Sequence, residues 1–340
     1  MAVFGYNIVR VFIDPGNWNR ETGINGPWET GHLDEAYLDH FADFLLRATR
    51  HRLYVLPSID GVPLNRHYWE IFSPPAPNIE GMNSHYLAPG HIAAKKAYLE
   101  DFIDALQARV GSEFLTSIFA YQLVNELVYQ GRKLPFSSLT LEVTTANGKT
   151  YDMSDPIERQ LAADENTILY TDTMVDAIRS RDPDAMVTIG MFTYTASGKP
   201  EGPNGLLPIP PAGEDGRFPV RPAVLSQSTA LSFIDLHIYP GFGVPLEDDL
   251  ASSEWSDLDP ATPAMLGEYG ALKNRHANIL AGAAAMRSLQ LESCAFGFSG
   301  WLYWAYDLPG STWTLFEEGG LINQTVAPLY VPSPCGLKSN

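Results

Sequence analysis

Short apolar segments alternate with amphipathic ones along the whole chain. Seven apolar runs, rich in β-branched and aromatic residues, predict buried strands at 4–13, 52–59, 117–124, 185–192, 231–239, 264–269 and 296–306. Between several of them, apolar residues recur at helical spacing, which predicts helices over 38–48, 98–106, about 157–181 and about 274–290. Near-continuous apolar strands that alternate with helices are typical of a parallel sheet covered by helices.

One segment departs from this alternation. Residues 139–154, LTLEVTTANGKTYDMS, form two alternating runs around Asn147-Gly148, which predicts a β-hairpin insertion. The Pro- and Gly-rich stretches at 73–90 and 198–222 follow strands, so we interpret them as long loops of one domain. The sequence therefore predicts a single catalytic domain over 1–340, with an irregular tail at 324–340.

The predicted strands carry long loops, prolines, glycines and aromatic residues at their C-terminal ends. In a (β/α)8 TIM barrel, the active site is built on this face. A doubly wound open sheet binds ligands there too, but it usually has a Gly-rich phosphate-binding turn after its first strand. The first run, 4–13, is not followed by such a turn, so the pattern favours the barrel.

Two predicted strands end on carboxylates. The run FAYQLV stops at Asn125-Glu126, which is either a simple loop start or helix cap, or a strand end that presents Glu126 to a site. The run AMLGEY places Glu268 in the same way, and Arg10 lies inside the first apolar run. A buried guanidinium and a buried carboxylate each need a partner, so we expect an Arg10–Glu268 ion pair that keeps Glu268 ionised by lowering its pKa.

The segment IDLHIY places polar groups along one face of another strand. Because side chains alternate across a strand, Asp235, His237 and Tyr239 share a face and should point into the barrel. A lone buried histidine is usually a core residue, but Tyr239 at the rim favours a site role for His237. Two strand-end carboxylates on this face suit glycoside hydrolysis, in which one stays ionised and the other is held protonated.

Together with Trp304, these motifs resemble the clan A glycoside hydrolases, most of all glycoside hydrolase family 5, which contains cellulases, mannanases and their relatives. In that clan an Arg lies on barrel strand two and Asn-Glu ends strand four. His-x-Tyr ends strand six, the nucleophilic Glu ends strand seven, and a Trp on strand eight lies under the sugar. The order of motifs along this chain fits over about residues 4–310.

The resemblance implies a retaining β-glycoside hydrolase that acts on a β-linked glucan, mannan or related oligosaccharide without a metal or other cofactor. It implies that Glu126 is the acid/base and Glu268 the nucleophile. The implied substrate-binding residues are Arg10, Asn125, His237, Tyr239 and Trp304. Among these, Asn125 would bind the sugar 2-hydroxyl, Tyr239 would touch the nucleophile, and His237 would order the site.

The chain departs from the family pattern in two places. Leu127 follows Asn-Glu where the family often has proline, and the region after 52–59 lacks the usual strand-end histidine pattern. Candidates for the missing subsite are Asp60, His67 and Trp69. The remaining candidates, equally explained as sugar platforms or as packing, are Trp18, Trp28, Trp255 and Trp313.

The number of strands is the largest departure. Seven runs are present, and the motifs make the first of them barrel strand two, so the first β/α unit is missing and the predicted hairpin follows barrel strand four. A barrel open between strands two and eight would expose unpaired edges. The tail at 324–332, a second copy in a homo-oligomer or another partner chain could cover them, and a start placed too late would also explain the gap.

The charge composition limits the classes of binding partner that are expected. The 340 residues include 40 acidic and 22 basic side chains, a net charge of −18, which argues against nucleic acids and anionic membranes and is compatible with a neutral saccharide. No stretch approaches 18 apolar residues, so no membrane span is expected. The start has no signal-peptide pattern, but an export signal could have been lost with a truncated start, so localisation stays undetermined.

Cys294 and Cys335 are too few for a disulfide framework and lack metal-site spacing, which leaves a single bridge open. Three other functions also remain open. A non-catalytic carbohydrate-binding barrel would keep the aromatic residues, and a transglycosidase would use the same two carboxylates. An unrelated barrel enzyme would place Glu126 and Glu268 far apart.

Overall fold

The computed structural model describes residues 1–16, 23–29, 31–203, 206, 213–241, 243–306 and 320–336. Within these ranges the strands are β1 (Ile8–Phe12), β2 (Tyr54–Ser58), β3 (Tyr121–Gln122), β4 (Val128–Gln130), β5 (Glu142–Thr144), β6 (Thr150–Asp152), β7 (Val187–Thr188), β8 (Gly190–Phe192), β9 (Arg217–Pro219), β10 (Ile234–His237), β11 (Ala264–Tyr269) and β12 (Phe298–Tyr303). The α-helices are α1 (Glu35–Arg50), α2 (Arg66–Phe72), α3 (Asn83–Leu87), α4 (Pro89–Val110), α5 (Pro156–Arg179), α6 (Pro222–Ser228), α7 (Leu246–Ala251), α8 (Ile279–Ser293) and α9 (Leu321–Val326).

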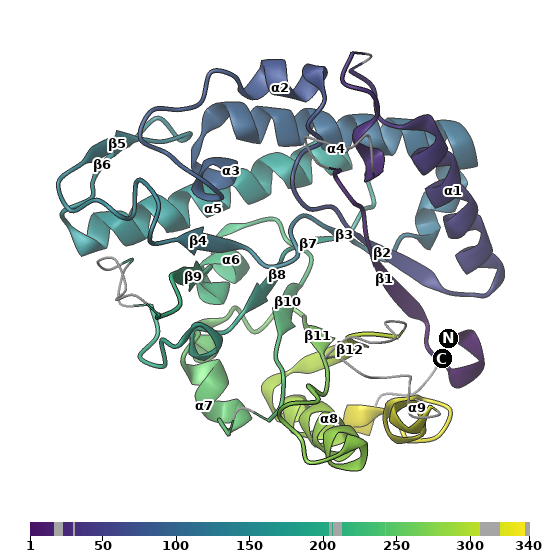
Figure 1. Cartoon of the computed structure of the whole chain (residues 1–340). Helices are drawn as coiled ribbons and strands as arrows, with labels where there is room; N and C mark the ends of the chain where they lie inside the picture. Colours follow the sequence, from purple (N-terminus) through teal and green to yellow (C-terminus); the bar gives the residue numbers. More distant parts are fainter. Residues whose placement is uncertain are drawn as a thin grey trace.

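The parallel strands form two four-stranded sheets, in the orders β1-β2-β3-β7 and β12-β11-β10-β8. Only Ile189 separates β7 from β8, so the two sheets meet in one apolar run and the strands occupy seven consecutive positions. In Figure 1 the strands lie in the centre and the helices surround them. Each predicted strand run contains a strand of this arrangement, which is that of a (β/α)8-type barrel.

Side-chain caps fix the start of several helices. Asp34 caps α1 by accepting a hydrogen bond from the backbone N–H of Tyr37 (2.7 Å). Helix α8 starts later than the predicted position 274, at Ile279, because the side chain of Asn278 accepts from the N–H of Ala281 (3.0 Å). No helix in the described ranges combines the length and apolar character that a membrane crossing requires.

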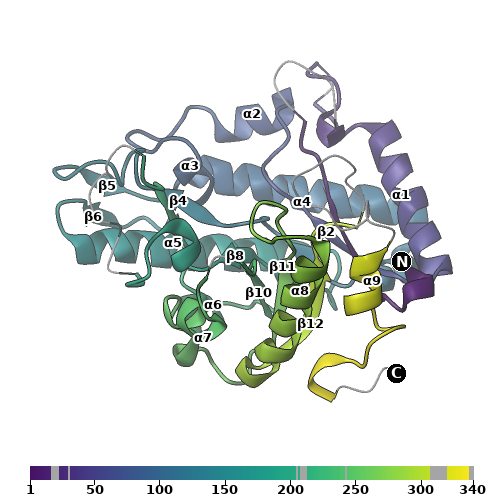
Figure 2. The same cartoon turned by 60° about the horizontal axis from the view of Figure 1, so that its bottom comes forward.

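The barrel is open between its two end strands. Among the described residues no hydrogen-bonded ladder joins β1 to β12, as the missing first unit predicts. The rings of Tyr6 and Tyr303 fill part of this opening (5.4 Å between centroids), and both hydroxyls donate to Oδ1 of Asn323 in α9 (2.8 and 2.9 Å). A backbone hydrogen bond from Leu329 to Phe4 (3.0 Å) holds the tail beside the N-terminal segment, and both views show α9 there (Figures 1 and 2).

The C-terminal segment therefore covers part of the opening, and in its described residues it does so without forming a strand. Its described part contains α9 and a short 3₁₀ turn at Pro334–Gly336. Cys294, directly after α8, forms a disulfide with Cys335 in that turn. This bridge answers the question that the cysteine count left open, and it ties the tail to the barrel.

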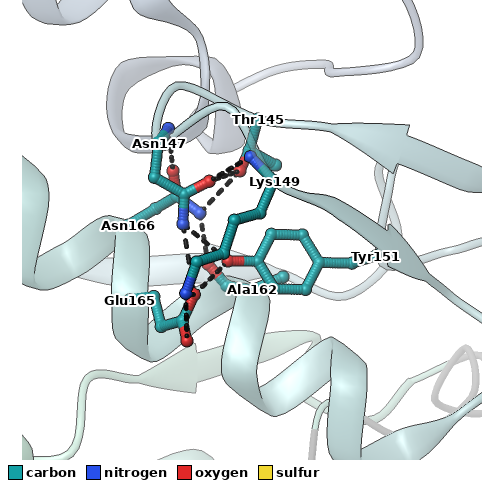
Figure 3. Close-up of polar contacts among 7 residues, drawn as sticks. All are labelled: Thr145, Asn147, Lys149, Tyr151, Ala162, Glu165 and Asn166. Carbon is teal, nitrogen blue, oxygen red and sulfur yellow. Dashed lines mark hydrogen bonds and ion pairs between the residues drawn. The ribbon is translucent and has the colours of Figure 1, made fainter.

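The predicted hairpin insertion is the antiparallel pair β5–β6. Figure 3 shows how its turn is attached to α5. The amide nitrogen of Asn147 donates to the hydroxyl of Tyr151 (2.6 Å) and to Glu165 of α5 (3.2 Å), and Lys149 pairs with the same carboxylate (2.9 Å). These polar contacts fix the position of the hairpin against the helix.

The strands separate an outer core from a small cluster inside the barrel. Ile234, Leu236 and Ile238 are buried in the large core between strands and helices, as their alternation predicts. The inner cluster contains Leu56, Ala120, Phe233 and Met265. Above it, the inward positions become polar, and these positions build the candidate site.

Candidate active site

The strand register brings the polar positions of β10 and β11 together. A bulge after Leu236 pairs His237 with Glu268 across the two strands. Gly267 directly precedes Glu268, and the Asp235 carboxylate lies against it. A Cβ atom at position 267 would lie 1.4 Å from Oδ1 of Asp235. Only glycine allows this approach, so the sequence Gly-Glu at the end of β11 is needed for the geometry of the site.

The two strand-end carboxylates lie next to each other. One oxygen of Glu126, one ring nitrogen of His237 and one oxygen of Glu268 are all within 4.8 Å of one another. Retaining glycosidases place their two carboxyl groups about 5–5.5 Å apart, whereas inverting enzymes need about 6.5–9.5 Å for a water molecule. The short separation fits a retaining arrangement, and it contradicts the alternative in which these two residues are far apart.

Glu268 accepts hydrogen bonds on both carboxylate oxygens. Arg10 Nη1 lies 2.7 Å from Oε2, which confirms the predicted ion pair, and the hydroxyl of Tyr239 donates to Oε1. Burial and the negative charge of Glu268 raise the pKa of Tyr239, so its hydroxyl stays protonated and remains a donor. Arg10 also donates to the side-chain oxygens of Gln122 (2.9 Å) and Asn125 (Oδ1). Its guanidinium thus connects β1 with β11 and with the segment at the end of β3.

Glu126 is bound differently. Its carboxylate lies 3.1 Å from Nδ1 of His237. Desolvation raises the pKa of Glu126, but the hydrogen bond to His237 and the charges of His237, Arg217 and Arg10 outweigh it, so the pKa of Glu126 is lowered from its ordinary value. In the unliganded site the surrounding donors and cations therefore favour the charged form of Glu126.

A second polar layer supports the carboxylates from below. Gln122 donates to Asp235 (2.6 Å), whose other oxygen lies 3.7 Å from Nε2 of His237. Burial raises the pKa of Asp235, against the opposing effects of His237, Arg10 and Gln122. The side chain of His237 is fully buried and holds Glu126 in place at the base of the cleft. The predicted inward face of β10 is confirmed, since His237 lies 3.1 Å from Glu126 and 3.7 Å from Glu268, and Tyr239 donates to Glu268.

A cleft of about 910 Å³ opens above the carboxylates. Beside Glu268, it is lined by Trp304 and Phe12, whose rings meet edge to face at 5.4 Å. Phe192 and Arg217 also line it. Exposed aromatic faces next to hydrogen-bonding groups suit the binding of a sugar ring.

The Glu126–His237–Glu268 group also has enough donor atoms for a metal ion. However, the cationic guanidinium of Arg10 lies on one oxygen of Glu268 and the hydroxyl of Tyr239 on the other. A divalent cation at Glu268 would be repelled by Arg10 and would have to displace it. The donor set therefore favours acid–base and nucleophilic chemistry by the two carboxylates.

Among the other sequence candidates, Asp60 follows β2 and lies against the backbone of Asn125, close enough to Arg10 and Glu126 to interact with their charges. It also lines a small separate cavity together with the buried Lys95. In the described part of the structure neither His67 nor Trp69 lines the cleft. Trp28 packs against Trp69 (6.3 Å between ring centroids).

Trp255 is buried and stacks on Phe298 (4.7 Å), so it serves in packing. Trp18 and Trp313 lie outside the described residues.

Three residues of the site carried little or no sequence signal. Gln122 is a polar residue within an apolar strand, and this irregularity could have identified it. Phe12 looks like any other apolar strand residue, and Arg217 lies in a Pro- and Gly-rich segment that the pattern assigns to a loop. Their place in the site depends on how distant segments pack.

The departure at Leu127 has a structural reason. Its N–H donates to the backbone oxygen of Gly190 (3.0 Å), which a proline could not do, and the chain continues into β4. The strand that ends in Asn125-Glu126 is therefore extended by a further paired segment.

Comparison with known proteins agrees with this architecture. The exo-β-1,4-mannosidase Op5Man5 from Opitutaceae bacterium strain TAV5 has 18% sequence identity and a TM-score of 0.52, over 91% of this chain and 47% of that one. The β-1,4-mannanase from the sea hare Aplysia kurodai has 15% identity and a TM-score of 0.51, over 97% and 82%. PbGH5A, a glycoside hydrolase family 5 enzyme from Prevotella bryantii B14, has 14% identity and a TM-score of 0.52, over 97% and 84%.

The chain spans about half the length of the mannosidase. No protein-family model and no curated protein matches it. At these identities the likeness concerns the fold, and it confirms the predicted class: a (β/α)8-type barrel like those of family 5 glycoside hydrolases.

Proposed function

We propose that the protein is a retaining β-glycoside hydrolase that works by double displacement through a glycosyl-enzyme. The observation that carries this proposal is the separation of at most 4.8 Å between oxygens of Glu126 and Glu268 at the base of an open cleft. Two adjacent carboxylates, one of them paired with Arg10, are the groups that retention requires.

In the first step, a carboxylate oxygen of Glu268 attacks the anomeric carbon while the bond to the leaving oxygen breaks. Glu126, protonated when the substrate binds, transfers its proton to that oxygen. The departing saccharide leaves with a free hydroxyl, and the glycosyl unit stays on Glu268 as an ester. In the second step, Glu126 removes a proton from water, the water attacks the anomeric carbon, and Glu268 leaves as a carboxylate.

The remaining residues orient the sugar. The carbonyl oxygen of Asn125 accepts from Arg10, so the amide NH₂ is the group that Asn125 offers to the sugar 2-hydroxyl. Trp304 and Phe12 give an aromatic surface for the ring on the Glu268 side. Arg10 and His237 are positioning residues, because their side chains are almost or fully buried beneath the carboxylates.

The proposed substrate is a neutral β-linked oligo- or polysaccharide, with β-1,4-glucan and β-1,4-mannan as the first classes to test. The acidic chain supports a neutral saccharide over a polyanion, because its net charge of −18 would repel the latter. Two of the structures that share the fold are named as a mannosidase and a mannanase.

The test is hydrolysis of β-linked gluco- and manno-oligosaccharides, with the anomeric configuration of the first product followed by NMR. We expect a β-configured product from the wild-type protein and loss of turnover in Glu268→Gln. An α-configured first product would contradict retention. Binding without turnover would instead identify a carbohydrate-binding barrel, and transfer of the glycosyl unit to excess acceptor saccharide, in preference to water, a transglycosidase.

A further inference from the structure

A two-stranded ribbon continues from the segment that carries Glu126. Directly after Glu126 and Leu127, β4 pairs antiparallel with β9, with Val128 opposite Pro219 and Gln130 opposite Arg217. The pairing brings β9, almost ninety positions further along the sequence, close to Glu126. Arg217 is the first residue of β9, and it lines the cleft.

The guanidinium of Arg217 is held as a fixed plane. It lies over the ring of Phe192, 4.7 Å from the ring centroid, and it pairs with Asp215 through Nε (3.0 Å) and Nη2 (2.7 Å). A stacked and bidentate arginine loses little further side-chain freedom when it donates to a ligand. Its side chain is 46% exposed, so it remains accessible from the cleft.

The position of Arg217 is on the side of the acid. Its charge is among those that lower the pKa of Glu126, and Glu126 in turn helps the Asp215 ion pair to raise the pKa of Arg217. Trp304 and Phe12 lie with Arg10 on the side of Glu268. Because the acid must face the leaving oxygen, the Arg217 side of the cleft is where the departing group would lie.

We propose that Arg217, stacked on Phe192, binds the saccharide unit on the leaving-group side of the scissile bond, by donating hydrogen bonds to its hydroxyl groups. This inference rests on the proposed function, and it adds that the departing group is itself a sugar. A small aryl or alkyl group would leave these donors unused.

The charges around the cleft select a neutral sugar. Asp215 already neutralises Arg217, and Glu126 is a further carboxylate near it. A uronic acid on the departing unit would meet more negative than positive charge there. The departing unit is therefore a neutral sugar, as in a β-glucan or β-mannan.

The experiment compares two substrates with the same glycone, a β-1,4-linked gluco- or manno-oligosaccharide and the matching 4-nitrophenyl β-glycoside. For Arg217→Ala we expect the loss of kcat/KM on the oligosaccharide to exceed the loss on the aryl glycoside by about 10- to 100-fold, as expected for hydrogen bonds to a charged donor. Arg217→Lys should recover only part of this ratio, since it keeps the charge but not the plane. Arg47→Ala, which removes an exposed arginine paired with Asp43, is the matched control and should change neither substrate.

A second readout is the pH profile. Loss of the Arg217 charge should raise the pKa of Glu126, so the fall of kcat/KM at high pH should move to higher pH in Arg217→Ala. If Arg217 only helped the ribbon to fold, its replacement would lower kcat/KM on both substrates equally. Equal losses of kcat/KM on the two substrates would overturn the proposal. A higher kcat/KM on an oligosaccharide that carries uronic acid, lost in Arg217→Ala, would overturn it as well.

Binding separates this inference from the proposed function. Calorimetry on Glu268→Gln and on the double variant Glu268→Gln with Arg217→Ala measures oligosaccharide affinity without turnover. If the wild-type protein hydrolyses neither substrate but Arg217→Ala still weakens binding, the subsite stands and the hydrolase assignment fails. Unchanged affinity in the double variant would contradict the subsite.

Discussion

Arg10 and Glu268, 258 positions apart in the sequence, form an ion pair of 2.7 Å with side-chain exposures of only 6% and 11%. The pair joins β1 and β11, which lie on opposite sides of the open edge of the barrel. Arg10 also donates to Gln122 and Asn125, so a single guanidinium connects both sheets at the site. Stability and geometry of the site therefore depend on the same side chain.

Replacing this arginine should damage both properties. For Arg10→Met we expect a loss of about 3–5 kcal/mol in the free energy of unfolding, because Glu268 is left as an unpaired buried charge. Urea denaturation measures it, and Arg47→Met, which breaks an exposed pair, should cost less than about 1 kcal/mol. Equal stability of the two variants would show that the buried pair contributes nothing.

The acid and the nucleophile should respond differently to the leaving group. Glu126→Gln should lower kcat/KM about 10²- to 10⁴-fold on an oligosaccharide, whose leaving oxygen needs a proton. With a 2,4-dinitrophenyl glycoside, which needs no proton, the loss should be much smaller. Glu268→Gln should abolish turnover of both substrates, so identical patterns in the two variants would refute the assigned roles.

The pH dependence should reflect the lowered pKa of Glu126. Because Glu126 must be protonated to act as the acid, kcat/KM should fall as the pH rises through this pKa, giving an acidic optimum. His237→Phe removes the hydrogen bond and the charge that favour the ionised form, so the fall should move to higher pH. A pH profile that His237→Phe leaves unmoved would rule out Glu126 as the group responsible.

The same lowered pKa also affects stability, but here the ionised form of Glu126 is the favourable one, whereas catalysis needs the protonated form. A carboxyl whose folded-state pKa is lowered stabilises the protein above its unfolded pKa, and this contribution disappears as the pH falls through the folded-state value.

Gly267 should not tolerate a side chain. Gly267→Ala would place Cβ 1.4 Å from Asp235 Oδ1, so we expect a loss of about 1–3 kcal/mol or more in the free energy of unfolding, together with reduced activity as Glu268 shifts. At Gly216 the nearest atom to a new Cβ is Cγ of the flexible Arg132 side chain, at 3.2 Å. Thermal unfolding of Gly216→Ala is therefore the control, and similar shifts in both variants would argue against the close approach.

The disulfide should stabilise the open barrel. The Cys294–Cys335 disulfide links two residues that are 41 positions apart in the sequence. Cys335→Ser removes this link, and we expect a loss of about 2–4 kcal/mol in the free energy of unfolding. Adding a reductant to the wild-type protein should lower its unfolding temperature to that of the variant, and should leave the variant unchanged. A reductant effect on Cys335→Ser itself would point to another cause.

The alternation of apolar runs and helical spacing predicted most strand positions, because burial on both faces leaves a clear pattern in each segment. The motifs at the strand ends predicted Glu126, Glu268 and their partner Arg10, since a polar group inside an apolar run needs a specific role. By contrast, α8 began several residues later than predicted because a local cap decided its start.

The sequence by itself determined the barrel class, the two carboxylates and the inward face of β10, because each depends on the order and spacing of residues within one segment. Only the tertiary structure decided the separation of the carboxylates, the lowered pKa of Glu126, the closing of the open edge by Tyr6, Tyr303 and the tail, and the return of Arg217 to the cleft. These properties depend on distances and fields between segments far apart in the chain, and no local pattern encodes them.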